Sequence, residues 1–170
     1  MTRRGFTVVE LIITVTIMGI LLTLAVVNLN STQVGARDTE RKEDIAAIAT
    51  NLEAYYRNGL ETSTVIGRYP HTGLATSGET SLRASLRDID FKSATAPGSA
   101  SVAATFVAAT NNNQTTTGVA PQPTTSQYVY QPLQPDGSLC TGGTQDCRKF
   151  NLFYRLEADN VVYVVTSKNQ

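Results

Sequence analysis

The sequence contains few of the side chains that build catalytic sites. Among 170 residues there is one histidine, His71, and it lies in a Tyr-Pro-His-Thr stretch without a serine, cysteine or carboxylate at catalytic spacing. No nucleophile elbow, phosphate-binding loop or zinc-binding pattern occurs. We therefore expect His71 to be a surface residue and the chain not to be an enzyme.

An excess of charge of either sign is also lacking. The chain has 14 basic and 14 acidic side chains, and without Arg3 and Arg4 it would have 12 basic against 14 acidic. Dedicated duplex binders usually carry a basic patch or stripe. The balance therefore predicts no dedicated nucleic-acid site on what we expect to be a single compact head.

Two cysteines, Cys140 and Cys147, are separated by six residues in a stretch rich in Gly, Thr and Asp. Neither has a neighbouring Cys or His to complete a tetrahedral metal site. The spacing favours a short-loop disulfide, which indicates an oxidising, extracytoplasmic compartment. Two free thiols are the alternative.

Oxygen ligands for calcium are equally sparse in this region. Asp136, Ser138 and Asp146 are the candidates, but three scattered ligands fall short of the roughly six to eight that calcium prefers. We expect no cofactor and no metal, with a calcium ion at these residues as the minor alternative.

No charged side chain occurs from Leu11 to Val27. With the five residues before it, this apolar run gives a helical stretch of about 22 residues, enough to span the hydrocarbon core of roughly 30 Å. Arg3 and Arg4 precede the run, and no basic residue follows until Arg37. The positive-inside rule then predicts a single-pass chain with its N-terminus in the cytoplasm and the remainder outside.

Glu10 lies at the leading edge of this apolar run. A carboxylate at bilayer depth costs about 2.5 to 3.5 kcal/mol on insertion scales, so its presence indicates a function. One alternative is that Glu10 only reaches back to the lipid headgroups. A second is an ordinary secretory signal peptide cleaved near Val34-Gly35-Ala36, although such peptides have apolar runs of about 7 to 15 residues and no use for an acid there.

The stretch Gly5-Phe6-Thr7-Val8-Val9-Glu10-Leu11-Ile12 resembles the processing motif of type IV pilins and pseudopilins. The resemblance implies that a prepilin peptidase cuts between Gly5 and Phe6, removes residues 1–5 as a leader, and methylates the new amine of Phe6. It also implies a subunit that polymerises with copies of itself and with minor pilins through an inner-membrane assembly platform.

Cleavage would create an α-amine on Phe6, four residues before Glu10. Positions four apart share one helix face and differ by about 6 Å in axial rise, so contact within one chain would be long. Between chains, a subunit in a fibre could offer its Glu10 to the amine of an incoming subunit, as the resemblance implies. That pairing would remove an isolated charge from the bilayer and fix the axial register.

Beyond the apolar run the helix is predicted to continue as an amphipathic half. Apolar side chains recur there at helical spacing, at Ile45, Ile48, Ala49, Leu52 and Tyr56. The charged residues 37–44 should form a mostly solvated face with pairs such as Asp38 and Arg41, each worth little. Asn58-Gly59 supplies the stop, about 80 Å from Phe6 at 1.5 Å per residue.

The head shows signals for one short helix and three strands. The helix is expected over 81–90, and the strands over 127–131, 150–157 and 160–166, where aromatic and β-branched residues concentrate. Residues 93–126 are rich in Thr, Ala, Ser and Asn and predict a long surface excursion. The resemblance implies an α+β pilin fold: a long N-terminal helix packed on a small antiparallel sheet of about three to four strands.

These observations predict four regions: a leader (1–5), a transmembrane and polymerisation half of the helix (6–28), an amphipathic half (29–58), and an extracellular head (59–170) with a disulfide loop at 140–147. The predicted function is a structural subunit of a type IV pilus. A pseudopilin of a secretion or competence system is the first alternative, and a bitopic surface binding protein that does not polymerise is the second. Relatives often have a proline in the apolar half; here only Gly19 suggests local melting of the helix in a fibre.

Overall fold

The structure is a computed structural model, and it describes residues 6–59, 66–76, 78–87, 89–101 and 105–169. The chain divides into two compact units, Met1–Ala36 and Arg37–Gln170. Helix α1 (Val8–Asn58) contributes residues to both units. The predicted leader (1–5) and most of the segment between Gly59 and Arg68 lie outside the described residues.

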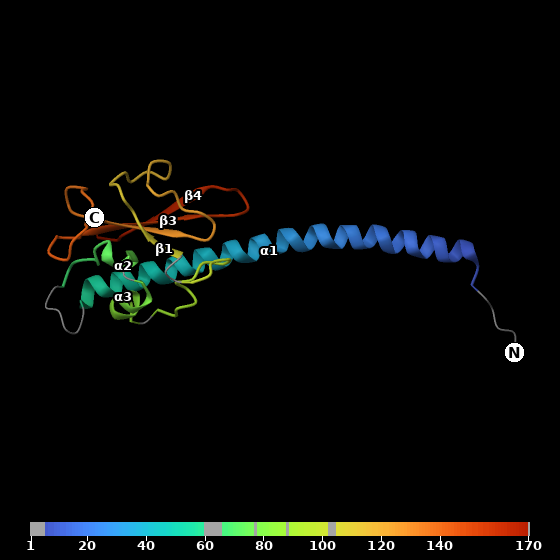
Figure 1. Ribbon diagram of the computed structural model, residues 1–170, viewed down its shortest axis with the longest axis horizontal. Coiled ribbons are helices and arrows are strands. Elements are labelled where there is room, and N and C mark those ends of the chain that lie inside the picture. Colours follow the sequence, from blue (N-terminus) through green and yellow to red (C-terminus); the bar gives the residue numbers. More distant parts are fainter. Residues whose placement is uncertain (1–5, 60–65, 77, 88, 102–104, 170) are drawn as a thin grey trace. The chain divides into compact units, whose positions relative to one another are not determined.

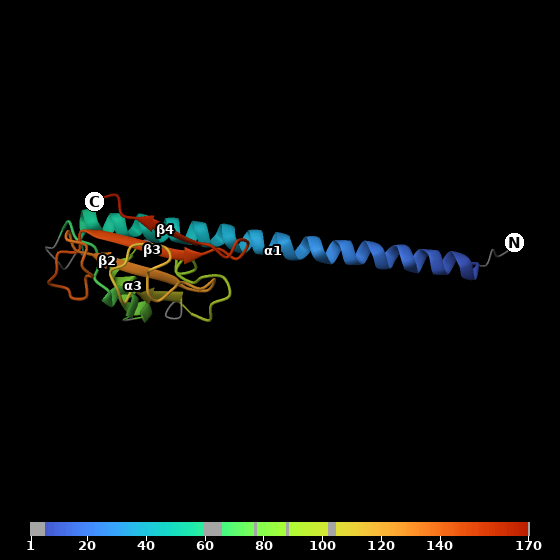
Figure 2. The ribbon, with the colours of Figure 1, turned by 90° about the horizontal axis from the view of Figure 1, so that it is seen from above.

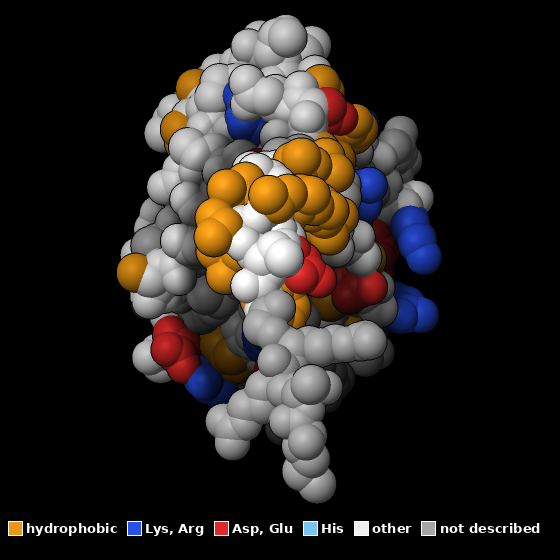
Figure 3. Space-filling model, turned by 90° about the vertical axis from the view of Figure 1, so that its right-hand side faces the viewer, with side chains coloured by type: hydrophobic (Ala, Val, Ile, Leu, Met, Phe, Trp, Pro, Cys, Tyr) orange, Lys and Arg blue, Asp and Glu red, His pale blue; other side chains and the backbone are white. Residues whose placement is uncertain are grey.

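The first unit consists of the N-terminal part of α1, whose aliphatic side chains lie exposed. The following side chains of α1 are all more than half exposed, as is Phe6 just before the helix: Val8, Val9, Leu11, Ile12, Ile13, Val15, Ile17, Met18, Ile20, Leu21, Leu22 and Leu24. Figure 3 shows hydrophobic side chains gathered around this end of the helix. Within the described residues, α1 is the one helix long and apolar enough to cross a membrane by length and composition. Exposed apolar surface of this extent is unfavourable in water and favourable in lipid.

The hydroxyl groups in this apolar part bond to the helix itself. Thr14 donates to the carbonyl of Leu11 at 2.9 Å, Thr16 to that of Ile13 at 2.8 Å, and Thr23 to that of Ile20 at 2.8 Å. A threonine that donates to a carbonyl one turn earlier presents no unsatisfied donor to lipid. The three hydroxyls are therefore compatible with a membrane span.

In the second unit the C-terminal part of α1 packs on a sheet. Ile45, Ile48 and Leu52 are each 1% exposed or less, and they join one core cluster with Phe150 and Leu152 of the sheet. Figures 1 and 2 show strands β3 (Lys149–Arg155) and β4 (Val162–Thr166) running alongside this part of the helix. The apolar stripe predicted from helical spacing is therefore the face that packs on the sheet, and the α+β class is confirmed.

The sheet has four strands in the order β1-β2-β3-β4, which adds β1 (Phe106–Ala108) to the three that the sequence predicts. β2 (Tyr128–Leu133) pairs antiparallel with β3, and β3 with β4. β1 pairs parallel with β2, with Phe106 opposite Tyr128, so the sheet is mixed rather than antiparallel. A parallel pair requires a crossover connection, and residues 109–127 provide it.

The prediction that residues 93–126 form a surface excursion is wrong for part of this crossover, which is buried against the sheet. Ala109 and Val119 are 3% and 2% exposed and pack with Val129 and Phe153, on the face of the sheet opposite Leu152. Because both faces of β2 and β3 carry buried side chains, the second face needs a cover, and a Thr- and Asn-rich segment supplies it.

A buried polar contact anchors the same segment. The side-chain amide of Gln131, which is fully buried, donates to the carbonyls of Asn111 and Asn113 at 2.9 and 3.0 Å. Asn151 donates to the amide oxygen of Gln131 at 2.9 Å. The polar composition that suggested an exposed loop therefore serves in part to bond it to the sheet.

Helix ends and turns follow the residues that predict them. α1 ends at Asn58, and Gly59 takes a φ of 65° while donating to the carbonyl of Tyr55. The predicted helix at 81–90 is α3 (Gly78–Ser85), followed by a turn that still buries Leu86 and Ile89. A short helix α2 (Gly73–Thr76) precedes it and was not predicted.

Candidate processing and assembly site

The predicted cleavage position lies directly before α1. Phe6 and Thr7 precede the helix, and the side chain of Phe6 is 75% exposed. Gly5, on the other side of the predicted cut, lies outside the described residues. The chain just after the predicted cut is therefore non-helical for two residues, and the side chain of Phe6 is accessible.

Thr7 forms the hydrogen bonds that start the helix. Its hydroxyl oxygen accepts the backbone N–H of Glu10 at 3.2 Å, and its carbonyl accepts the backbone N–H of Leu11 at 3.2 Å. An N-cap residue makes these two bonds, one through the side chain and one through the main chain. Sequence reasoning passed over Thr7, although a Thr followed three residues later by Glu is a signal for a helix start.

Glu10 occupies the first turn of α1 and is exposed among exposed aliphatic side chains. The N-terminal turn of a helix carries a partial positive charge, which favours a carboxylate at that position. This location lowers the cost of the Glu10 charge without providing a cationic partner. Its pairing with the amine of Phe6 in another subunit remains a prediction.

Where the second unit begins, α1 bears a cluster of charged side chains directed at the turn between β3 and β4. Arg41 donates to Asp38 at 2.7 Å, to Glu157 at 3.3 Å and to the carbonyl of Thr125 at 2.7 Å. Arg37 holds the Glu157 carboxylate through two bonds, at 2.6 and 2.9 Å. Asp38 and Arg41 are 5% and 2% exposed, so the predicted solvated pair is in fact buried.

Backbone contacts complete this cluster. The two carboxylate oxygens of Asp38 accept the backbone N–H groups of Glu157 and Ala158 at 2.8 and 2.9 Å. Burial alone would raise the pKa of Asp38, but these bonds and Arg41 outweigh it and leave the pKa below its ordinary value. The bond from Arg37 likewise lowers the pKa of Glu157. Both acids are therefore held in the charged form that clamps the turn to α1.

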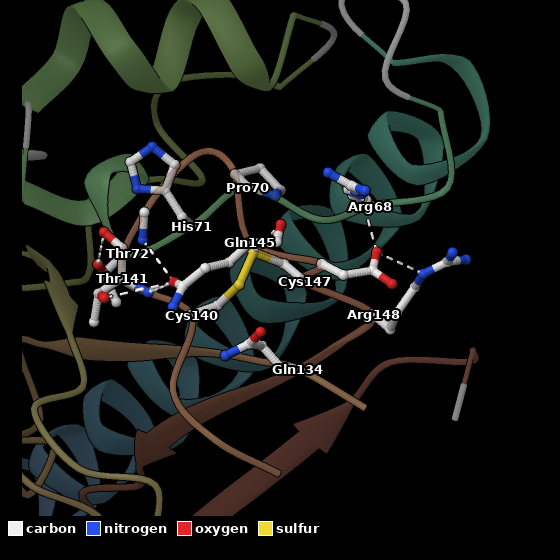
Figure 4. Close-up of a disulfide and its surroundings, with 12 residues drawn as sticks. Arg68, Pro70, His71, Thr72, Gln134, Cys140, Thr141, Gln145, Cys147 and Arg148 are labelled. Carbon is white, nitrogen blue, oxygen red and sulfur yellow. Dashed lines mark hydrogen bonds and ion pairs between the residues drawn. A yellow bond between two sulfur atoms is a disulfide. The ribbon is translucent and has the colours of Figure 1, made fainter. Parts of the chain in front are cut away.

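Cys140 and Cys147 form a disulfide, the pairing that the sequence predicts, with Cα atoms 5.8 Å apart (Figure 4). The backbone on either side of it is bonded to the segment after α1: Tyr69 N–H donates to the carbonyl of Cys147 at 2.7 Å and Thr72 N–H to that of Cys140 at 3.0 Å. Both cysteines are buried, at 0% and 2% exposed. The small loop therefore ties residues 69–72 to the sheet.

The side chains considered for calcium have other partners. One carboxylate oxygen of Asp146 forms ion pairs with Arg68 at 3.0 Å and with Arg148 at 2.8 Å. Both pairs are drawn in Figure 4. Asp136 accepts the backbone N–H and hydroxyl of Ser138 within its turn. Among the residues that the structure describes, no three His, Cys, Asp or Glu side chains come together as a metal site.

His71 is half-buried rather than a simple surface residue. Its Nδ1 accepts the backbone N–H of Gly73 at 2.9 Å, where α2 begins. A single such bond is a helix-start contact, and it orients the ring toward the disulfide loop, where Gly143 lies close to it. Its role in the structure is local.

A buried acid that sequence reasoning missed lies under the sheet. Asp44 of α1 is 4% exposed, and its carboxylate accepts the hydroxyl of Tyr128 on β2 at 2.7 Å. Burial raises the pKa of Asp44 to about 6, against the opposing effect of the Tyr128 bond. No local pattern marks this contact, because the two residues are 84 positions apart.

Comparison with known proteins locates a match at the N-terminus. Residues 1–26 match a sequence profile described as the prokaryotic N-terminal methylation motif. No curated protein and no solved structure matches the chain significantly. The motif implies processing by a prepilin peptidase and assembly into pilus-like polymers, and its family consists of structural subunits. With its exposed apolar helix, the motif fits a membrane-anchored precursor that is later assembled outside the cell. Residues 1–26 therefore carry the methylation motif of a class III signal peptide of the type IV pilin and pseudopilin family.

Proposed function

We propose that this protein is a structural subunit of a type IV pilus. In this proposal a prepilin peptidase cuts between Gly5 and Phe6, methylates the new amine of Phe6, and releases a subunit that polymerises through residues 6–28 of its helix. The observation that carries the proposal is the methylation motif at residues 1–26, which extends into the N-terminal part of α1, where large apolar side chains lie exposed.

The exposed surface of the first unit supports polymerisation through the helix. Its aliphatic side chains are compatible with lipid before assembly and with the same side chains of neighbouring subunits afterwards, so transfer from membrane to fibre keeps them out of water. Glu10 adds a charged side chain to this apolar surface, and this charge can specify where a neighbouring subunit binds. The amine of Phe6 on another subunit is the partner we propose for Glu10, because pairing opposite charges lowers the cost of each in lipid.

The orientation follows from the charges at the N-terminus. Arg3 and Arg4 hold the leader at the cytoplasmic face, where the peptidase acts, and the head lies on the other side. A disulfide in the head accords with that oxidising compartment. Copies of the chain, minor pilins and the inner-membrane assembly platform are the partners that we propose for the processed subunit.

The head supports a pilus rather than a secretion pseudopilin. Its Thr-rich crossover presents exposed polar side chains at 112–115 and 117, beside the buried contacts that hold it. The disulfide loop likewise exposes Thr141 and Gly143. Exposed polar loops of this kind suit a surface that is permanently in contact with the medium.

Mass spectrometry of fibres sheared from the cell surface tests the proposal. We expect a chain that begins at Phe6, carries one methyl group on its amine, and is two hydrogens lighter than the dithiol form because of the disulfide. An intact Met1 in the fibres would refute processing. Absence of the chain from all sheared fibres, with the chain retained in the membrane, would favour the non-polymerising alternative.

Charge reversal tests the pairing itself. Glu10→Lys should leave a membrane-bound precursor and no fibres, because it places like charges where the amine must bind. Glu43→Lys is the matched control, since Glu43 is an exposed acid on the same helix within the second unit. The control should assemble normally. Normal fibres from Glu10→Lys would show that Glu10 has no ionic partner in assembly.

A further inference from the structure

The start of α1 has the hydrogen bonds of a capped helix. α1 begins at Val8, directly after Thr7. The Thr7 hydroxyl oxygen accepts the N–H of Glu10 at 3.2 Å, and its carbonyl accepts the N–H of Leu11 at 3.2 Å. The first turn of any helix has N–H groups without partners inside the helix. Thr7 supplies a partner for one of these groups at a position where lipid can supply none.

The residues around Thr7 fit a complete helix-start pattern. A Thr at the cap with a Glu at the third helical position is a capping box, in which the Glu carboxylate bonds back to the N–H of the cap residue. Thr7 and Glu10 have this spacing. Phe6 and Leu11 occupy the two positions, before the cap and fourth in the helix, where apolar side chains commonly accompany the box.

We propose that Thr7 is a positioning residue for subunit assembly, which keeps the processed amine of Phe6 outside the helix and sets Glu10 in the first turn. This inference rests on the proposed function, since it explains how one chain presents both members of the intersubunit pair.

Electrostatics explains why the cap must fall at this residue. The N-terminus of a helix repels cations, so an amine in the first helical position would be opposed by its own helix. Because α1 begins at Val8, Thr7 separates that amine from the first turn. The same cap places Glu10 where the helix favours a carboxylate, and one of its two oxygens can bond to Thr7 N–H while the other remains for a neighbour's amine.

Three substitutions distinguish the effect of the capping oxygen of Thr7 from the effect of the rest of its side chain. Thr7→Val has nearly the same shape without a hydroxyl, whereas Thr7→Ser and Thr7→Asn keep a side-chain oxygen that can cap. In the full chain in detergent micelles, hydrogen exchange of the Glu10 amide should be about five- to tenfold faster in Thr7→Val than in wild type. The Ser and Asn variants should exchange at nearly the wild-type rate. Equal exchange rates of the Glu10 amide in wild type and all three variants would show that the Thr7 side chain does not cap the helix.

Fibre yield from cells tests the link to assembly. Thr7→Val should give several-fold fewer fibres than wild type, and Thr7→Ser and Thr7→Asn should restore them. Mass spectrometry of the membrane fraction must find Thr7→Val cut and methylated; if it stays uncut, the defect lies in processing and the positioning role is overturned. Normal fibres from Thr7→Val overturn it as well. If the wild-type chain forms no fibres, the proposed function fails together with the assembly role, while the exchange rates still decide the cap.

Discussion

Replacing Asp44 by asparagine should stabilise the head at neutral pH. Asp44 is 4% exposed, between α1 and β2, and its Oδ2 accepts the Tyr128 hydroxyl at 2.7 Å. Burial is the main cause that raises its pKa from 3.8 to about 6, and the nearby acid Glu40 adds to the rise. An asparagine at this position keeps an oxygen for the Tyr128 hydroxyl and removes the charge.

The sign and the size of this stability change follow from the pKa of Asp44 in the folded protein and in the unfolded chain. The folded protein holds the Asp44 proton more tightly than the unfolded chain does, so this residue contributes stability below pH 3.8 that is lost as the pH rises through about 6. The full difference corresponds to roughly 3 kcal/mol at 1.36 kcal/mol for each pH unit. Because rearrangement and water access reduce such costs, we expect Asp44→Asn to raise the free energy of unfolding by about 1 to 3 kcal/mol at neutral pH.

Urea unfolding of the full chain in detergent micelles, followed by the near-ultraviolet circular dichroism of its tyrosines, measures this effect. The stability difference between Asp44→Asn and wild type should be near zero at about pH 3.5 and reach its full value above about pH 7. Asp38 and Glu157, whose lowered pKa values stabilise the head as the pH rises, act equally in both proteins and cancel.

Glu43→Gln is the control for this experiment, because Glu43 is the exposed acid next to Asp44 in sequence. Its stability should differ from wild type by about 0.5 kcal/mol or less at either pH. A stability difference for Asp44→Asn that is the same at both pH values would refute the reasoning, since it would have to come from packing and not from the charge.

Three further predictions concern the supports of the head, each measured by urea unfolding. Removing the disulfide with Cys140→Ala and Cys147→Ala should lower the free energy of unfolding by about 2 to 3 kcal/mol, the loop-closure value for so short a loop. A reductant should leave the stability of this double variant unchanged but should destabilise the wild-type protein. Arg41→Met should cost about 3 kcal/mol or more by leaving Asp38 buried without its cation, and adding Asp38→Asn should recover part of that loss; equal losses in the single and double variants would contradict this. Gln131→Leu should cost about 1 to 3 kcal/mol by leaving buried carbonyls and an amide without partners, and a smaller change would mean that the crossover rearranges.

Local patterns predicted the parts of the fold that depend on near neighbours in sequence. Ile45, Ile48 and Leu52 form the buried stripe of α1 because helical periodicity alone assigns them to one face. The end of α1 at Asn58 followed from Gly59, whose positive φ few other residues accept. The motif around the first turn is equally local, which is why Phe6 and Glu10 were predicted as site residues before any fold was known.

Contacts between distant segments were not predictable in this way. The burial of Asp38 depends on backbone N–H groups of Glu157 and Ala158, about 120 positions away. β1 was missed because a three-residue strand in a Thr- and Ala-rich segment has almost no signal of its own. Its pairing is decided by β2, which needs a partner on its free edge.

The two units of this chain differ in whether their side chains find partners within the same unit. In the second unit, within the described residues, no fully buried side-chain nitrogen or oxygen lacks a partner, and the charged side chains of α1 that face the sheet are bonded inside the unit. The first unit exposes its apolar side chains and Glu10 without a cationic partner among the described residues. The exposed apolar surface of the described residues, which is favourable in lipid, is therefore concentrated in the N-terminal part of α1. We propose that cleavage between Gly5 and Phe6, which would remove Arg3 and Arg4 and expose an amine on Phe6, gives that surface the cation that Glu10 lacks.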